Sequence, residues 1–199
     1  DVKRQNDVIN RQIEVCILLM APFLIAFSLF IPIIVRLLFT FEFLKVVPMV
    51  LCGTFYLYFK AITTPVAYLP LGKGDSVMYF TMETLYCVFS VCILTVGYSL
   101  WGLTGAGIAL SVSNLFDMVM ISIVYHLKYG YTFSKRVIIT AAGQGLLLVT
   151  GVYMAFMSDL WLKYLCGFPV LAVSTVWALR TLSKETEVIS VIRHYFGRK

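Results

Sequence analysis

The sequence predicts an all-α, polytopic membrane protein with six transmembrane helices, and three observations support this. Hydrophobic residues make up 60% of the 199-residue chain and charged residues only 13%, and the mean hydropathy is +0.90. A soluble domain of this size needs more polar side chains to cover its surface. The apolar residues also form six runs that are each long enough to cross a bilayer, where the backbone has to be helical.

The six runs follow one another with short polar connections. Several contain proline, which membrane helices tolerate and which commonly marks a kink. We expect a short amphipathic helix on the membrane surface after the sixth run, although a solvated basic tail is an equal alternative. The expected runs are 13–39, 46–70, 78–100, 103–127, 137–157 and 160–179, followed by the tail 183–199.

The basic residues between the runs predict the orientation. Counted by side, Lys and Arg number twelve on one side and three on the other, where Arg36, Lys45 and Lys163 lie. The positive-inside rule then places both termini in the cytoplasm, which requires an even number of spans. The formal net charge of +6 follows this pattern and forms no aromatic-laced patch of the kind that binds nucleic acid.

Lys60 is the most informative residue because it lies near the middle of an apolar run. A cation at that depth costs about 3 kcal/mol or more on insertion scales. We therefore expect a carboxylate, a water-filled cavity or an anionic ligand to face it. Helical spacing places the following residues on one stripe: Gly53, Tyr56, Lys60, Thr63 and Thr64.

Two acidic residues inside the runs are the candidate partners. Asp117 shares a stripe of the fourth run with Asn114, and Glu83 lies nearer the cytoplasmic end of the third. Two interpretations stay open. In one, Lys60 pairs with Asp117 or Glu83 and the pair only orients helices. In the other, the stripes line a hydrated cavity where Lys60 attracts a phosphate or another anion.

Enzymatic chemistry has little support in the sequence. His126 and His194 have no nucleophile or carboxylate at a supportive spacing. The cluster Gly102–Gly107 lacks the lysine and hydroxyl residue of a phosphate-binding loop, and its small residues are typical of two helix ends in close contact. Five cysteines lie inside apolar runs without metal-ligand spacing, so we expect no metal and no cofactor.

Four strings resemble a polysaccharide or O-antigen-type flippase of the multidrug/oligosaccharidyl-lipid/polysaccharide exporter superfamily. The resemblance covers about residues 10–134, and the glycine string at the start of the fourth run is its most specific part. The strings are Pro32–Phe39 followed by Glu42-Phe43, Tyr68–Gly74, Gly97–Ala109 and Tyr129–Ser134.

The resemblance implies a bacterial inner-membrane transporter that carries a lipid-linked oligosaccharide outward by alternating access, for lipopolysaccharide or other surface polysaccharide. The partners implied are the isoprenoid diphosphate sugar, membrane lipids and a missing N-terminal lobe, because the chain starts without methionine and has half the expected spans. Residues 1–134 would form four helices of the C-terminal lobe and 135–182 two additional ones. Lys60, Tyr56, Thr63 and Thr64 would bind substrate, with Asp117, Glu83 and Asn114 coupling an ion or pairing with Lys60.

Three alternatives remain. A cation-coupled multidrug extruder of the same superfamily would favour an acidic, aromatic cavity. A membrane-embedded glycan polymerase or acyltransferase would need converging groups on outer loops, where only Glu42 and Asp159 are available. A purely structural membrane subunit would lock Lys60 to Asp117.

Overall fold

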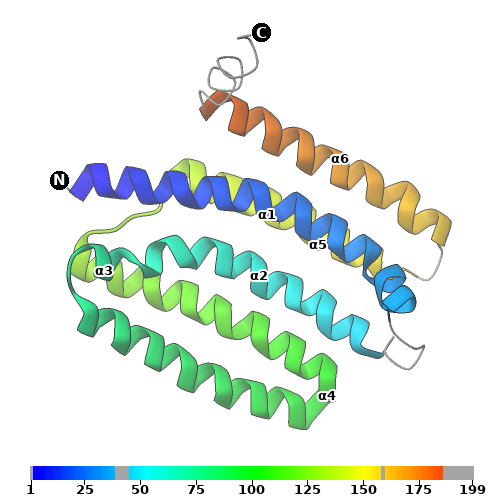
Figure 1. Cartoon of the computed structure of the whole chain (residues 1–199), viewed down its shortest axis with the longest axis horizontal. Coiled ribbons are helices and arrows are strands. Elements are labelled where there is room, and N and C mark those ends of the chain that lie inside the picture. Colours follow the sequence, from blue (N-terminus) through cyan, green and yellow to red (C-terminus); the bar gives the residue numbers. More distant parts are fainter. Residues whose placement is uncertain (1, 39–44, 158–159, 186–199) are drawn as a thin grey trace.

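The computed structural model describes residues 2–38, 45–157 and 160–185, and all regular structure in these ranges is helical (Figure 1). The predicted all-α class is therefore confirmed. The elements are α1 (Val2–Leu38), α2 (Val47–Ala67), α3 (Leu69–Gly72), α4 (Ser76–Tyr129), α5 (Lys135–Ala155) and α6 (Leu160–Glu185).

Five of these helices, all except α3, are long and apolar enough to cross a membrane. The longest, α4, contains both the third and the fourth predicted run. Its backbone leaves the helical conformation at Trp101 and Gly102, where Gly102 has a φ of 60° that favours glycine. At this point the chain reverses, so that α4 is a hairpin of two arms, 76–100 and 103–129 (Figure 1).

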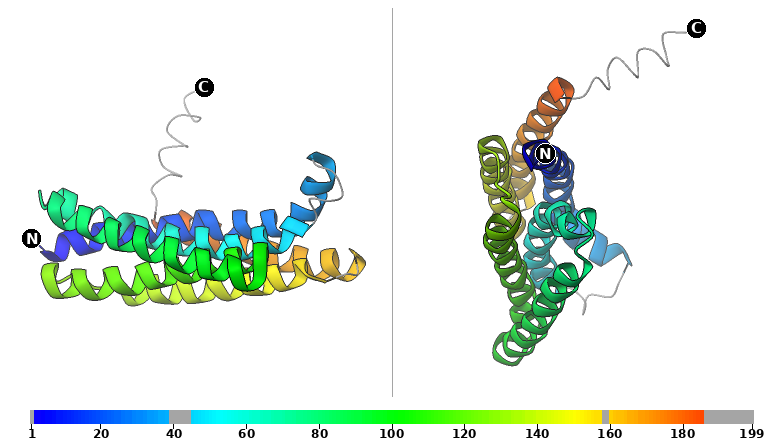
Figure 2. Two further views of the ribbon diagram at one scale, coloured as in Figure 1. Left: turned by 90° about the horizontal axis from the view of Figure 1, so that it is seen from below. Right: turned by 90° about the vertical axis from the view of Figure 1, so that its left-hand side faces the viewer.

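Helix α1 occupies the centre of the bundle and packs against α2, α5 and α6. Its buried face repeats every four residues, as expected for one side of a helix. Its last turns swing out of line with the rest (Figure 2), and Pro22 and Pro32 lie inside it. The fully buried row consists of Ile13, Ile17, Ala21, Ile25 and Leu29.

The sequence did not predict that α1 begins at Val2, eleven residues before the apolar run. These polar residues are helical because they bind the connection between α4 and α5. The Asn6 side chain donates to the Gly130 carbonyl at 3.0 Å. Asn10 donates to the Thr132 carbonyl at 2.9 Å and accepts from the Ser134 amide at 3.0 Å.

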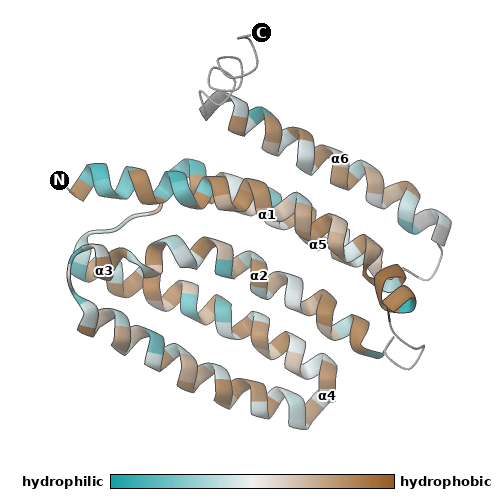
Figure 3. Ribbon diagram, in the orientation of Figure 1, coloured by the Kyte–Doolittle hydropathy of each residue, from teal (hydrophilic) through white to brown (hydrophobic). Residues whose placement is uncertain are grey.

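Apolar residues predominate along most of the length of each long helix, and many of the polar residues lie toward the helix ends (Figure 3). Large apolar side chains such as Phe23, Phe80 and Trp161 are 64%, 71% and 91% exposed. So large an exposed apolar surface is unusual for a soluble monomer. It is compatible with a protein embedded in a membrane.

The element ends divide into two groups at opposite ends of the bundle (Figure 1). The N-terminus, α3 and the α4–α5 connection lie at one end. The reversal of α4, the last turn of α1 and the first turn of α6 lie at the other. The three basic residues predicted on the minority side, Arg36, Lys45 and Lys163, all belong to this second group of element ends.

Glycine allows the two arms of α4 to approach each other near their reversal, as the sequence predicted for this cluster. A Cβ atom on Gly97 would lie 2.7 Å from the Gly105 carbonyl oxygen, and one on Gly105 would overlap the Gly97 carbonyl oxygen. Both positions therefore require glycine if the arms are to keep this spacing. Gly107 makes a similar close contact with the Met49 backbone of α2.

We predict that Gly105→Ala lowers the free energy of unfolding by about 1–3 kcal/mol, because the added methyl group meets backbone that cannot move aside. Gly53→Ala is the matched control: no atom lies within 4 Å of its added Cβ, and alanine is the better helix former by up to about 1 kcal/mol. Thermal unfolding of both variants in detergent measures the difference. Equal stability of the two variants would contradict the close approach.

Candidate functional site

Lys60 of α2 faces the first arm of α4, half-buried. Its Nζ lies 4.7 Å from the centre of the Tyr86 ring, which is the geometry of a cation–π contact. Two predicted donors, Thr63 and Thr64, direct their hydroxyl groups to the Lys60 carbonyl at 3.4 and 2.7 Å. Their oxygens remain available only as acceptors in this arrangement.

Tyr86 connects Lys60 to the second arm of α4. The Asn114 side chain donates to the Tyr86 hydroxyl at 3.0 Å, and Ser113 and Ser90 form the next contact between the arms at 3.4 Å. Asp117 lies on the same face as Asn114, is only 4% exposed, and is close enough to interact electrostatically with Lys60.

We call Lys60, Tyr86, Asn114 and Asp117 the polar seam. The seam joins α2 to both arms of α4. These are the three segments in which the sequence predicted stripes of polar residues. Glu83 also acts on Asp117 electrostatically, and Tyr56 acts on the Tyr86 hydroxyl. The structure thus brings Lys60, Asn114 and Asp117 together, with Tyr56 and Glu83 beside them, whereas the Thr63 and Thr64 hydroxyl groups donate within α2.

No hydrogen bond or contact ion pair joins Lys60 to Asp117 or Glu83, all of which lie in the described ranges. The ammonium group is therefore balanced by an aromatic face and by carboxylates at longer distance. The Asn114 Oδ1 atom is buried and has no hydrogen-bond partner. A buried unpaired acceptor costs about 1–3 kcal/mol, so a hydrogen-bond donor or a cation beside Asn114 Oδ1 would stabilise the seam.

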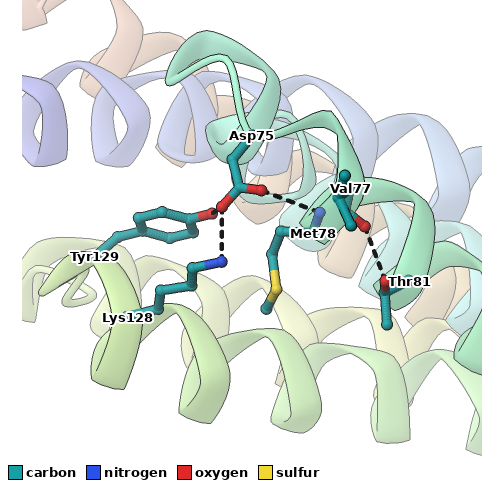
Figure 4. A network of polar contacts seen from close by, with 6 residues as sticks. All are labelled: Asp75, Val77, Met78, Thr81, Lys128 and Tyr129. Carbon is teal, nitrogen blue, oxygen red and sulfur yellow. Dashed lines mark hydrogen bonds and ion pairs between the residues drawn. The ribbon is translucent and has the colours of Figure 1, made fainter.

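A second polar cluster, which we call the clasp, closes the open end of the α4 hairpin (Figure 4). It consists of Asp75, Lys128 and Tyr129. Asp75 caps the first arm by accepting from the Met78 amide at 3.2 Å. It also accepts from Lys128 Nζ at 2.6 Å and from the Tyr129 hydroxyl at 2.8 Å. These donors stabilise the charged carboxylate and lower the pKa of Asp75 to about 2.

Two further polar residues, Gln144 and His126, have partners within the fold. Gln144 of α5 is fully buried and exchanges hydrogen bonds with Ser174, which joins α5 to α6. His126 lies at the end of α4 beside the Tyr131 carbonyl. The following residues named from sequence lie outside the described ranges: Glu42, Asp159, His194 and the tail from 186 onward.

Two buried charged residues were missed by the sequence analysis. Glu14 is 5% exposed and accepts from Thr140 at 3.5 Å, and Lys163 is 4% exposed. For Glu14 the signal was its four-residue spacing from Asn10 on the inward side of α1. For Lys163 the sequence carried no signal of burial, because a lysine at the end of an apolar run is typically exposed.

Comparison of the chain with protein-family models, curated protein sequences and solved structures finds no match. The resemblance to the exporter superfamily therefore depends on the sequence strings alone.

We predict that Asp75 contributes to stability at neutral pH and that this contribution is lost in acid. Its folded-state pKa of about 2 is below the ordinary value of 3.8. Stability from a lowered pKa is complete above the ordinary value and disappears as pH falls through the folded value. Unfolding of the wild type between pH 6 and pH 2 should therefore show an acid-dependent loss that is smaller in Asp75→Asn.

Asp7→Asn is the control for this measurement, because Asp7 is an exposed carboxylate on α1. It should keep the acid dependence of the wild type. An identical acid profile in Asp75→Asn and the wild type would show that the clasp does not stabilise the fold.

Proposed function

We propose that the chain is the C-terminal part of a membrane transporter that carries a lipid-linked oligosaccharide across a bacterial inner membrane. The polar seam would bind the diphosphate of the substrate, with Lys60 as the cation. The chain would cross the membrane six times, since each arm of α4 would make one crossing, with both termini in the cytoplasm. The substrate head group would enter from one side and leave on the other as the two lobes rearrange.

The observation that carries this proposal is the unneutralised Lys60 within the seam. A phosphate needs a cation that a neighbouring carboxylate does not already occupy, and Lys60 has an aromatic ring rather than an acid in contact with it. Tyr56 and Lys60 are both half-buried, so each side chain keeps some exposed surface. A lysine point charge suits the oxygens of a phosphate.

The charge distribution supports the proposed crossings. Arg36, Lys45 and Lys163, the three basic residues predicted on one side, are at the end of the bundle where α4 reverses. The clasp, which includes Lys128, and the nearby Lys73 are at the opposite end (Figure 1). Under the positive-inside rule the end with the clasp would face the cytoplasm.

A cation-coupled multidrug extruder is the second candidate, and a specific observation favours it. Asp117 is buried, and the Tyr86 ring already holds one cation on its face. A cationic drug displacing Lys60 from that ring would find an aromatic, acidic site. In this case Asp117, and not Lys60, would be the residue that the transported molecule requires.

We predict that Lys60→Met in the full-length protein abolishes surface polysaccharide while the protein remains in the membrane. The change removes the cation but keeps a flexible apolar side chain of similar length. Lys45→Met is the matched control, since Lys45 is exposed and remote from the seam. Surface polysaccharide and membrane abundance are measured together. Normal polysaccharide in Lys60→Met would exclude a substrate role for this residue.

Asp117→Asn separates the remaining interpretations. If Lys60→Met and Asp117→Asn each lower stability and the double variant restores it, the two residues form a structural pair. If Asp117→Asn alone removes drug tolerance while polysaccharide is normal, the chain is an extruder. Loss of polysaccharide without loss of stability in Lys60→Met supports the flippase.

We predict from the proposed topology that cysteines at Ser76 and Ser134 cannot be labelled from outside the cell. The five native cysteines are first replaced, and a membrane-impermeant maleimide is used on intact cells. Lys45→Cys lies at the opposite end of the bundle and should react rapidly. Rapid labelling at Ser76 or Ser134 would reverse the orientation.

A further inference from the structure

Two basic residues lie at the end of the bundle opposite the clasp, where α1 ends and α6 begins. Lys163 lies in the first turn of α6 and is 4% exposed, and Arg36 lies in the last turn of α1. Helices α1 and α6 are in contact, and the Arg36 charge acts directly on Lys163. Like charges repel, so bringing them together around a buried lysine is unfavourable unless an anion balances them.

The surroundings of Lys163 provide little compensation. Its Nζ lies 5.8 Å from the centre of the Tyr164 ring, near the limit of about 6 Å for a cation–π contact. No ion pair between described residues involves Arg36 or Lys163. The adjacent Tyr164 hydroxyl is buried and has no hydrogen-bond partner there. Arg36, Lys163 and the unpaired Tyr164 hydroxyl therefore all belong to the region where α1 ends and α6 begins.

An apolar groove begins at the same tyrosine. It has a volume of about 460 Å³ and lies on the outer side of α6. The Tyr164 ring separates the groove from the α1 side, where it packs 6.3 Å from Phe30. The groove is lined by Trp161, Tyr164, Leu165 and Phe168.

We propose that Arg36, Lys163 and the Tyr164 hydroxyl bind the phosphate group of an anionic phospholipid, and that one acyl chain of this lipid occupies the groove. Arginine and lysine are the preferred partners of phosphate oxygens, and a tyrosine hydroxyl can donate to a third. In a bilayer, helix ends with aromatic residues lie at headgroup level, where such a phosphate is found. An apolar groove beside the cations favours a lipid over free phosphate.

This proposal requires membrane insertion but not oligosaccharide transport. The lipid phosphate would bind where α1 ends and α6 begins, the acyl chain would lie on the outer side of α6, and the lipid would stabilise the packing of α6 on α1. Glu42 and Asp159 lie close to the two cations in the sequence but outside the described residues. A carboxylate of Glu42 or Asp159 is therefore the competing occupant of the site, and the variants used to test the proposal distinguish it from a lipid.

The test measures thermal unfolding of the full-length protein in neutral detergent with three added probes: short-chain phosphatidylglycerol, short-chain phosphatidylcholine and inorganic phosphate. We expect phosphatidylglycerol to raise the unfolding midpoint by several degrees and the other two to have little effect. Lys163→Met and Arg36→Gln should each weaken the apparent affinity at least tenfold. Lys45→Met, the matched basic control, should keep the full response.

Three outcomes would overturn the proposal. No response of the wild type to phosphatidylglycerol, or an unchanged response in Lys163→Met, would exclude the site. An equal response to inorganic phosphate would show that the ligand is a soluble anion and not a lipid. If the wild type does not respond to phosphatidylglycerol, and Asp159→Asn or Glu42→Gln lowers the unfolding midpoint and creates a response to this lipid, a carboxylate fills the site.

If Lys163→Met does not fold, Lys163→Arg provides a second measurement of the role of the charge at this position. Arginine retains the charge, so this variant should keep the response to phosphatidylglycerol. Native mass spectrometry of the purified wild type provides an independent measurement, with one bound phospholipid expected and none in the Arg36→Gln variant.

Discussion

The structure depends on how an apolar bundle accommodates the charge of Lys60. Insertion of an isolated lysine at this depth costs about 3 kcal/mol, and contact with a carboxylate is a common way to reduce that cost. Here the ammonium group lies over the Tyr86 ring instead, while Asp117 interacts from farther away. The charge is stabilised without being neutralised in contact, which is the property that an anion-binding residue needs.

This arrangement is possible because the α4 hairpin is closely spaced. The Gly97–Gly105 contact brings the two arms together near their reversal. At that spacing the Asn114 side chain reaches the Tyr86 hydroxyl at 3.0 Å, and the Phe89 and Phe116 rings stack at 3.9 Å between their centres. A larger residue at either glycine would separate the arms where the seam requires contact. The glycine string therefore positions the seam and does not itself bind a ligand.

Helical periodicity predicted Lys60, Asn114 and Asp117 of the seam but not Tyr86, whose ring contacts Lys60. Lys60, Glu83 and Asp117 come from three different runs, and each lies on the polar stripe of its own helix. Because the apolar faces of these helices point away from one another, the three polar stripes come together. Periodicity could not predict that Thr64 donates to the Lys60 carbonyl, since that choice is local. Nor could it predict the burial of Lys163, which follows from the contact between α1 and α6, two helices far apart in sequence.

The two ends of the α4 hairpin are fixed by different interactions, and this restricts how the seam can change. Glycine backbone contacts hold the arms at the reversal, and the clasp of Asp75 with Lys128 holds them at the other end. The Tyr86–Asn114 contact lies between these two points, so the arms cannot separate there unless one end opens. Helix α2 contacts α4 near its beginning, through Gly107, and also at its last residue, where the Tyr125 hydroxyl donates to the Ala67 carbonyl at 3.5 Å. A change in access to Lys60, which lies between these two contacts, would therefore require α2 to move against the hairpin at one of them, and the lysine would leave the Tyr86 ring as it did so.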